Sequence, residues 1–325
     1  MEKQLNLVQE LAKKFGYNEY MIDRYLKLFG KDQILDFLEG NEQELLTSIK
    51  VNTLKISEDA LLRKLESKGF ELEPVSVVSN AFYVKKAPFS IGATTEYLLG
   101  YYYIQNVASM IPSLVLKVTS GDIVVDMCAA PGGKTIQLAQ SMDNQGVILA
   151  IDLNRQRMKS LRSNISRCGV SNTITIRMDA ANLVDLHVKN ISKILLDAPC
   201  SGSGLIPSDP TRKTSRSYED IEFCSLIQMK LIKSAINCLE KGGELVYSTC
   251  SIEPEENEYI IEEVLKQFKV ELVDLDFNFG VPGLINIFGR NLTPDLKKAR
   301  RFYPYLHKTE GFFICKLKKV DRKST

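Results

Sequence analysis

Beyond residue 100, short apolar runs alternate with amphipathic helical segments, and this alternation constrains the fold more than any other feature. The runs are rich in β-branched residues and read DIVVDM (122–127), VILAIDL (147–153), TITIRMD (173–179), KILLDAP (193–199) and GELVYSTC (243–250). Helical stretches lie between them, including 154–169 and a segment near 217–240. Such a pattern is typical of a mostly parallel sheet covered by helices on both faces. The sequence therefore predicts a doubly wound α/β domain, in which ligands bind beyond the carboxyl ends of the strands.

The first 100 residues have a different pattern of predicted helices and strands, which indicates a separate, smaller domain. Apolar residues at helical spacing predict short helices in the first 40 residues. SIKVNTL (48–54) is typical of a strand, 57–69 of a helix with a Ser57 cap, and 70–85 of one or two more strands. For this 325-residue chain we expect an N-terminal helical and α+β domain over residues 1–95 and a second domain over 96–325.

Composition narrows the class of protein. Nothing approaches about 18 consecutive apolar residues, and the polar start of the chain does not resemble a signal peptide, so we expect a cytoplasmic protein without a membrane span. The seven cysteines contain no C-x-x-C pair, and only two histidines could join them as soft ligands. We therefore expect reduced thiols, no disulfide framework and no metal site.

Charge is distributed unevenly along the chain. The net charge is +2, yet residues 1–100 hold 13 Lys and Arg against 15 Asp and Glu, while residues 290–325 hold 11 against 3. The basic cluster in the second range is Arg290, Lys297, Lys298, Arg300 and Arg301. It is expected either to meet a nucleic-acid phosphate backbone or to form a solvated basic face.

A glycine-containing loop, CAAPGGK, follows the first strand of the second domain and precedes a helix. Glycines there let the backbone approach a ligand and leave helix N-terminal amides free. The GGKT tetrapeptide suggests a P-loop, but that motif requires glycine where Cys128 stands, and G-x-G-x-x-G is absent as well. A plain tight turn is the alternative to a ligand loop.

Two aspartates end the next two strands. Asp152 is placed to accept hydrogen bonds from both ribose hydroxyls of a nucleoside, and Asp179 is placed to contact an adenine amino group. Each alone could be a helix cap. A glycine-containing loop and two acidic strand ends in succession nevertheless indicate a nucleoside cofactor without a triphosphate cradle, for which S-adenosylmethionine is the candidate.

Two cysteines end the fourth and fifth strands, in KILLDAPCSGSG and LVYSTCS. Neighbouring strands would bring Cys200 and Cys250 to one cleft, together with Asp197. The remaining thiols are expected to serve packing, because they lie on an apolar helix face, before a glycine or within an apolar strand. They include Cys168, Cys224, Cys238 and Cys315.

The sequence resembles the Sun-domain (RsmB-like) RNA cytosine-5 methyltransferases. The resemblance covers at least 104–319 and is carried by DMCAAPGGKT, AIDLNRQRMKSL, MDA, LLDAPCSGSG, YSTCSIEPEENE and RRFYPYLHKTEGFFICKLKK, with IKVNTLK near Asn52. One departure stands near the end, where the family often has His after Pro and this chain has Tyr305, with His307 two residues later.

The resemblance implies a fold and a chemistry. It implies a Rossmann-like class I S-adenosylmethionine-dependent methyltransferase domain over 96–325. Cys250 would add to carbon 6 of cytosine, and Cys200 would assist release of the product. The reverse assignment of the thiols is the alternative, since DNA cytosine-5 methyltransferases use a Pro-Cys thiol. Asp197 would bind the base edge, and Lys134 would lower the thiol pKa or contact the base. The expected cofactor-binding residues are Cys128, Ala129, Ala130, Pro131, Gly132, Gly133, Lys134, Asp152, Arg157, Asp179 and Asp197.

The substrate base must be unpaired or flipped out of its stack. We expect the substrate to be RNA, and transfer RNA in preference to other classes. The N-terminal domain and the basic C-terminal stretch are expected to bind its backbone. Ribosomal RNA, an inactive RNA-binding assembly factor and a DNA substrate are the alternatives. Four aromatic residues are candidates for stacking on bases or for packing in the core: Tyr101, Tyr102, Tyr103 and Phe302.

Overall fold

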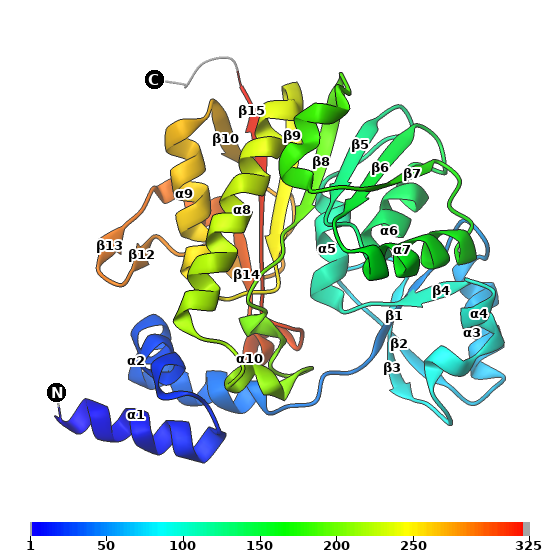
Figure 1. Cartoon of the computed structure of the whole chain (residues 1–325). Coiled ribbons are helices and arrows are strands. Elements are labelled where there is room, and N and C mark those ends of the chain that lie inside the picture. Colours follow the sequence, from blue (N-terminus) through cyan, green and yellow to red (C-terminus); the bar gives the residue numbers. More distant parts are fainter. Residues whose placement is uncertain (1, 321–325) are drawn as a thin grey trace.

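The computed structural model describes residues 2–320 and is built around one large mixed sheet (Figure 1). Its strands follow the order β11-β14-β15-β9-β8-β5-β6-β7, and β10 pairs with β15. The five parallel strands are β5 (Ile123–Met127), β6 (Val147–Asp152), β7 (Thr173–Arg177), β8 (Ile191–Asp197) and β9 (Leu239–Thr249). The antiparallel strands are β10 (Val270–Val273), β11 (Val281–Pro282), β14 (Arg300–Phe302) and β15 (Phe312–Lys319).

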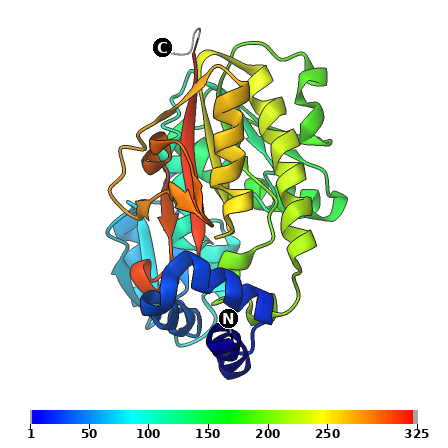
Figure 2. The same ribbon diagram turned by 90° about the vertical axis from the view of Figure 1, so that its left-hand side faces the viewer.

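Helices cover both faces of this sheet, because successive strand residues point to opposite sides. Val124 and Leu195 pack with α5 (Val107–Val115) and α6 (Gly133–Ser141), and α7 (Arg155–Arg167) adjoins them. Val125 and Leu196 pack with α8 (Tyr218–Cys238) and α9 (Glu258–Gln267), which lie side by side (Figure 2). The predicted doubly wound α/β domain is therefore confirmed.

A second, four-stranded antiparallel sheet has the order β2-β3-β1-β4 and lies apart from the large one (Figure 1). Its elements are β1 (Ser48–Val51), α3 (Glu58–Glu66), β2 (Glu71–Pro74), β3 (Ala81–Lys86), α4 (Thr95–Leu98) and β4 (Tyr102–Ile104). The amide of Asn52 donates to the carbonyls of Gly100 (2.7 Å) and Cys168 (2.8 Å). A Cβ at Gly100 would lie 2.1 Å from the Arg167 carbonyl oxygen, so glycine permits this close docking of the small sheet on α7.

The first two helices, α1 (Glu2–Phe15) and α2 (Glu19–Asn41), pack elsewhere, against the loops that follow β8 and β9 (Figure 1). They share a core with Ile206 and Ile252, which follow the two cysteine-bearing strand ends. Arg24 on α2 pairs with Glu253 (2.7 Å) and Glu255 (2.6 Å). Helices α1 and α2 thus pack directly on the large domain, while the small sheet has a hydrophobic core of its own.

The basic C-terminal cluster is largely engaged within the protein. Arg301 is 1% exposed and its guanidinium forms a paired contact with Glu258, with Nε at 2.6 Å from Oε1. Lys298 donates to the Leu272 carbonyl, and the Arg300 guanidinium donates to the Lys297 carbonyl. The expectation that Arg301 meets a phosphate backbone is therefore wrong, because a buried carboxylate claims its charge; Arg322 and Lys323 of the same stretch lie outside the described residues.

Two expected stacking residues belong to the core. Tyr102 and Phe302 are both 0% exposed, and the Tyr102 hydroxyl donates to the Ile91 carbonyl at 2.6 Å. Phe302 packs against Phe312 within the sheet. The core-packing alternative holds for these two rings. Across residues 2–320, no helix combines the length and apolarity that crossing a membrane requires.

The buried ion pair gives a stability prediction. Glu258→Gln leaves the Arg301 guanidinium buried without a counter-charge, so the free energy of unfolding should fall by about 3–5 kcal/mol. Asp23→Asn, which breaks an exposed pair with Lys27, should change it by less than about 1 kcal/mol. Urea unfolding of both variants measures the difference. Similar small losses for both would show that the Glu258 contact does not stabilise the fold.

Candidate active site

The strand order reverses at β5, which has β6 on one side and β8 on the other. The CAAPGGK loop leaves the carboxyl end of this strand, the place where open α/β sheets bind ligands. Gly132 has φ +110° and a Cβ there would come within 2.9 Å of Leu161 Cδ1, so this backbone requires glycine. Cys128 also adopts a positive φ, of 62°. The loop is therefore a specialised turn that leaves the α6 N-terminus open.

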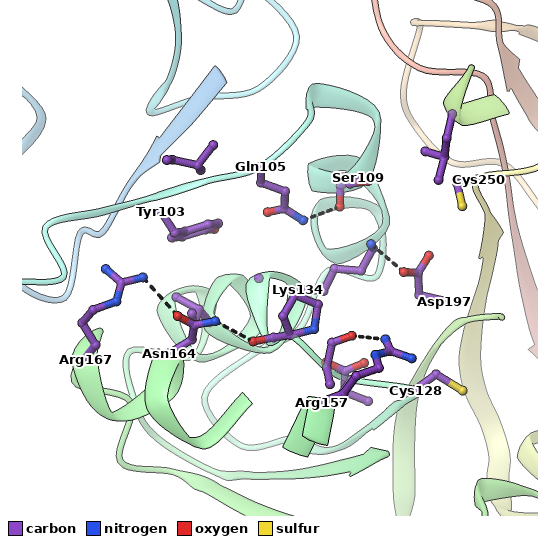
Figure 3. Close-up of a pocket in the computed structure, with 18 of the residues that line it drawn as sticks. Tyr103, Gln105, Ser109, Cys128, Lys134, Arg157, Asn164, Arg167, Asp197 and Cys250 are labelled. Atoms are coloured by element: carbon purple, nitrogen blue, oxygen red, sulfur yellow. Dashed lines mark hydrogen bonds and ion pairs between the residues drawn. The ribbon is translucent and has the colours of Figure 1, made fainter. Parts of the chain in front are cut away.

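A cavity of about 350 Å³ lies over this loop, between the small sheet and the large domain (Figure 3). Tyr103 and Gln105 approach from the small-sheet side, and Asn164 and Arg167 approach from α7. Lys134, Asp197 and Cys250 line the other end. Much of the remaining wall is formed by loop residues Cys128 to Pro131, by Gly133 at the start of α6 and by Arg157 on α7. Most of the predicted site residues are thus brought to one cavity.

Three buried polar atoms on the cavity wall have no hydrogen-bond partner within the described chain: Tyr103 Oη, Gln105 Oε1 and Asp126 Oδ1. Tyr103 is 4% exposed and Asp126 is 0% exposed. Buried polar groups without partners are unfavourable, so these atoms indicate a place for a polar ligand. Burial raises the pKa of Asp126 to about 7, although its other oxygen accepts a hydrogen bond from Thr135.

Asp152 and Asp179 contact the backbone and do not line the cavity. Asp152 accepts from the amides of Ala130 (3.2 Å) and Asn154 (2.9 Å). Arg157 lies 3.6 Å from the same carboxylate and donates to the Ala130 carbonyl. Asp179 accepts from the Ala181 amide at 3.0 Å and caps a short helical segment. The helix-cap alternative is thus met at Asp179, and Asp152 holds the shape of the loop.

A hydrogen-bonded chain crosses the opposite end of the cavity. Lys134 Nζ lies 2.7 Å from Asp197 Oδ2, and the Ser248 hydroxyl donates to Asp197 Oδ1 at 2.7 Å. Asp197 and Ser248 stand opposite one another in the parallel pairing of β8 with β9. Both oxygens of Asp197 are therefore oriented by neighbours.

The two strand-end thiols meet. Cys200 Sγ and Cys250 Sγ are 3.0 Å apart, and neither cysteine is in a disulfide. The hydrogen bond to Cys250, followed by burial, raises the pKa of the Cys200 thiol well above its usual value. Cys168 and Cys315 are buried in core clusters, as the sequence predicted. Within residues 2–320, no group of three or more His, Cys, Asp or Glu could hold a metal ion.

His307 lies away from this cavity, as does Tyr305. The His307 ring packs between Phe279 and Phe302, its Nδ1 accepts from the Tyr303 amide at 3.0 Å, and burial lowers its pKa. Tyr305 packs on α2, where a Cβ at Gly40 would lie 2.5 Å from the Tyr305 Cβ. The imidazole of His307 therefore has a packing role here.

Sequence reasoning missed the side chains that reach the cavity from a distance. Gln105, Asn164 and Arg167 have no motif around them, and only their juxtaposition in space marks them. Asp126 and Ser248 could have been found, because each lies one or two residues from a singled-out strand-end residue. Alternation along a strand gives the direction of such neighbours.

The strand order, the reversed final strand and the loop beyond β5 define a Rossmann-like class I methyltransferase. A crystal structure of a methyltransferase homolog from Pyrococcus horikoshii superposes with a TM-score of 0.88 at 43% identity, covering 96% of this chain and 99% of that one. The fold class expected from the sequence is therefore confirmed.

The family follows from two matches. Residues 113–318 match the family model of the 16S rRNA methyltransferase RsmB/F. Residues 18–107 match the model of the N-terminal domain of 16S rRNA methyltransferase RsmF. The chain belongs to the RsmB/F methyltransferase family. It is 40% identical over 320 residues to the mouse 28S rRNA (cytosine-C(5))-methyltransferase, covering 97% of this chain. It is 36% identical over 293 residues to ribosomal RNA small subunit methyltransferase F of Vibrio cholerae, covering 89%. The chain spans 40% of the mouse protein and 60% of the Vibrio protein.

Asp126 gives a pH-dependent prediction. Its pKa is raised from 3.8 to about 7 in the fold, so the unfolded chain loses this proton first and stability should fall between about pH 4 and about pH 7. Asp126→Asn does not titrate and should flatten that fall by at least about 1 kcal/mol. Urea unfolding across this range measures it. Asp276→Asn is the control, because Lys117 lowers the pKa of Asp276; an unchanged slope in Asp126→Asn would refute the assignment.

Proposed function

We propose that the chain transfers a methyl group from S-adenosylmethionine to carbon 5 of a cytosine in RNA, and that this RNA is ribosomal. The observation that carries the proposal is the pair of thiols, Cys200 and Cys250, 3.0 Å apart beside the Lys134–Asp197 pair. Both the mouse and the Vibrio relatives are named as ribosomal RNA methyltransferases, and the mouse name specifies cytosine carbon 5. These names support ribosomal RNA over the transfer RNA that the sequence favoured.

The cavity fits a nucleoside cofactor with a charged amino-acid end. Such a ligand would supply hydrogen-bond partners for the three buried polar atoms that lack them. The glycine at position 132 gives the loop the backbone conformation that borders the cavity. We propose that the loop from Cys128 to Lys134 would hold S-adenosylmethionine, with Arg157 and Asp197 beside it. Asp152 and Asp179 would have to contact it through lone pairs not taken by the backbone amides. When bound, this cofactor supplies a methyl group on a positively charged sulfur.

Covalent addition explains the need for a nucleophile. Carbon 5 of cytosine is a weak nucleophile until a thiolate adds to carbon 6, which turns the ring into an electron-rich enamine. We assign this thiolate to Cys250, which lines the cavity. Asp197 holds the N3 and amino edge of the base, and Lys134 and Ser248 fix the direction of its two oxygens. A preorganised carboxylate stabilises the protonated ring during attack.

Cys200 suits a different task because its sulfur lies 3.0 Å from that of Cys250, within reach of an S–H hydrogen bond between the two thiols. After methyl transfer, a water molecule must take the proton at carbon 5. The electrons of that C–H bond then re-form the double bond between carbons 5 and 6, and the bond from carbon 6 to sulfur breaks, so that Cys250 leaves as a thiolate. A neighbouring S–H donor stabilises that departing thiolate. Cys200 is therefore proposed to assist release of the methylated base.

The RNA must present an unpaired or flipped cytosine to this cavity. We propose that the N-terminal domain, expected over residues 1–95, helps to bind it. The cavity wall on that side comes from residues 97–105, which include strand β4 of the small sheet. Tyr103 and Gln105 are the side chains from that wall. Both thiols must stay reduced for this chemistry, which supports action in the cytoplasm.

Separate thiol variants test the mechanism. With RNA and labelled S-adenosylmethionine, Cys250→Ala should form no covalent RNA adduct and transfer no methyl, because the nucleophile is missing. Cys200→Ala should accumulate an adduct that survives a denaturing gel, because release is slowed. Cys224→Ala on α8 is the control and should behave as the wild type. An adduct that depends on Cys200 instead would exchange the two roles.

A substrate comparison tests the class of RNA. Transcripts of small- and large-subunit ribosomal RNA should accept at least about 10-fold more methyl than transfer RNA under the same conditions. The loss of one sequence-specific contact costs about 1–3 kcal/mol, which corresponds to a ratio of this size. Scintillation counting and mapping of 5-methylcytosine provide the readout, with Cys250→Ala as the blank. Methyl transfer confined to transfer RNA would restore that alternative. Binding of RNA without transfer to either class would favour an inactive assembly factor.

A further inference from the structure

A single buried carboxylate joins the two loops that carry the thiols. Glu256 is 0% exposed and lies in the turn Pro254–Glu256, between β9 and α9. Its partners include Ser201 and Ser251, the residues that directly follow Cys200 and Cys250. The role proposed above for the cysteines does not account for this group.

Both oxygens of Glu256 are occupied. Oε2 accepts from the Ser201 backbone amide at 2.8 Å and from Gln228 Nε2 at 2.9 Å. Oε1 accepts from the Ser251 hydroxyl at 2.7 Å and from the Ser201 hydroxyl. Gln228 also donates to the Pro199 carbonyl at 2.9 Å, which ties α8 to the same loop. One carboxylate therefore accepts from the first loop, the second loop and the helix behind them.

The hydrogen bonds of Glu256 hold the two cysteine loops at a place where their backbones are already closely packed. The Gly204 amide donates to the Cys250 carbonyl at 3.0 Å, and a Cβ at Gly204 would lie 2.0 Å from the Gly311 carbonyl oxygen. The loops are thus held on the backbone side by Gly204 and on the side-chain side by Glu256. Loss of either would let the two sulfurs separate.

The environment of Glu256 reflects its position. Burial raises its pKa, and the hydrogen bonds from Ser201, Ser251 and Gln228 oppose that rise. Its negative charge is also among the causes that raise the pKa of Cys200. A carboxylate here thus favours the protonated form of the neighbouring thiol as well as the arrangement of the loops.

We propose that Glu256 is a positioning residue that sets the distance and relative orientation of Cys200 and Cys250 through Ser201 and Ser251. The inference rests on the proposed function only for its consequence, since the thiols must meet for release of the product. Glu256 does not line the cavity, so it acts through the cysteines and not on the cofactor.

The test measures thiol proximity directly. Diamide oxidises two adjacent thiols to a disulfide and is itself reduced to the hydrazine, so its rate of linking Cys200 to Cys250 reports their geometry. Glu256→Ala should slow this cross-link by roughly 10-fold in the folded protein, as followed by peptide mass spectrometry. Single-turnover methyl transfer should fall by about 100-fold, as expected when reacting groups shift by about 1 Å. The dissociation constant for S-adenosylmethionine should not change.

Glu258→Ala is the matched control, because it removes another fully buried carboxylate two residues away, whose partner is Arg301. It should lower stability but leave the cross-linking rate of the folded protein unchanged. Ser251→Ala deletes only the link to the Cys250 loop and should give an intermediate rate. Glu256→Gln keeps the shape and an accepting oxygen, and should restore most of the rate lost in Glu256→Ala.

Two results would overturn the proposal. One is a wild-type cross-linking rate in both Glu256→Ala and Ser251→Ala. The other is equal slowing in Glu258→Ala, which would make the effect one of general destabilisation. Because the cross-link needs no RNA and no cofactor, it decides the role of Glu256 even if the wild type transfers no methyl. Absence of transfer alone would count against the proposed function and not against the positioning role.

Discussion

The parallel pairing of β8 with β9 is the constraint on which the site depends. It places Asp197 opposite Ser248, so the residues that follow each strand leave the sheet at the same edge. Two cysteines separated by 50 positions in the chain can then lie 3.0 Å apart. A slip of one residue would turn the strand-end side chains to the other face of the sheet. Apolar contacts on both faces of the sheet hold that register, since each strand contributes alternately to two cores.

The N-terminal elements complete the site from two directions. The helices α1 and α2 pack under the loops that carry the thiols, where Arg24 pairs with Glu253 directly after the second cysteine loop. The small sheet docks on α7 through Gly100 and Asn52 and forms the opposite wall of the cavity. A single large domain would therefore lack both the support for its thiols and one side of its binding cavity. The geometry of the proposed catalytic residues in the large domain therefore depends on residues far away in the sequence.

The strand-end residues were predictable because the alternation of strand and helix fixes where each strand ends. Asp197, Cys250 and most of the glycine-containing loop line one cavity, and Cys200 lies beside it with its sulfur 3.0 Å from that of Cys250. Arg301 was misassigned, because sequence cannot show that a carboxylate 43 positions away neutralises it inside the core. The sequence named Tyr103 only as a residue for stacking on bases or for core packing, and it did not single out Gln105 at all. Their role arises from docking between two domains, and local patterns carry no record of such docking.

Charge in the cavity links protonation to ligand binding. Asp126 is buried with one unpartnered oxygen and a pKa raised to about 7, so its ionised form is held at a cost in the free protein. A ligand that brings positive charge to this wall would stabilise the ionised carboxylate and lower that pKa. Binding would then release a proton and recover stability that the free protein loses as the pH rises through about 7. Lys134 and Asp197 neutralise one another at the other end, so Asp126 is the carboxylate left to balance such a charge.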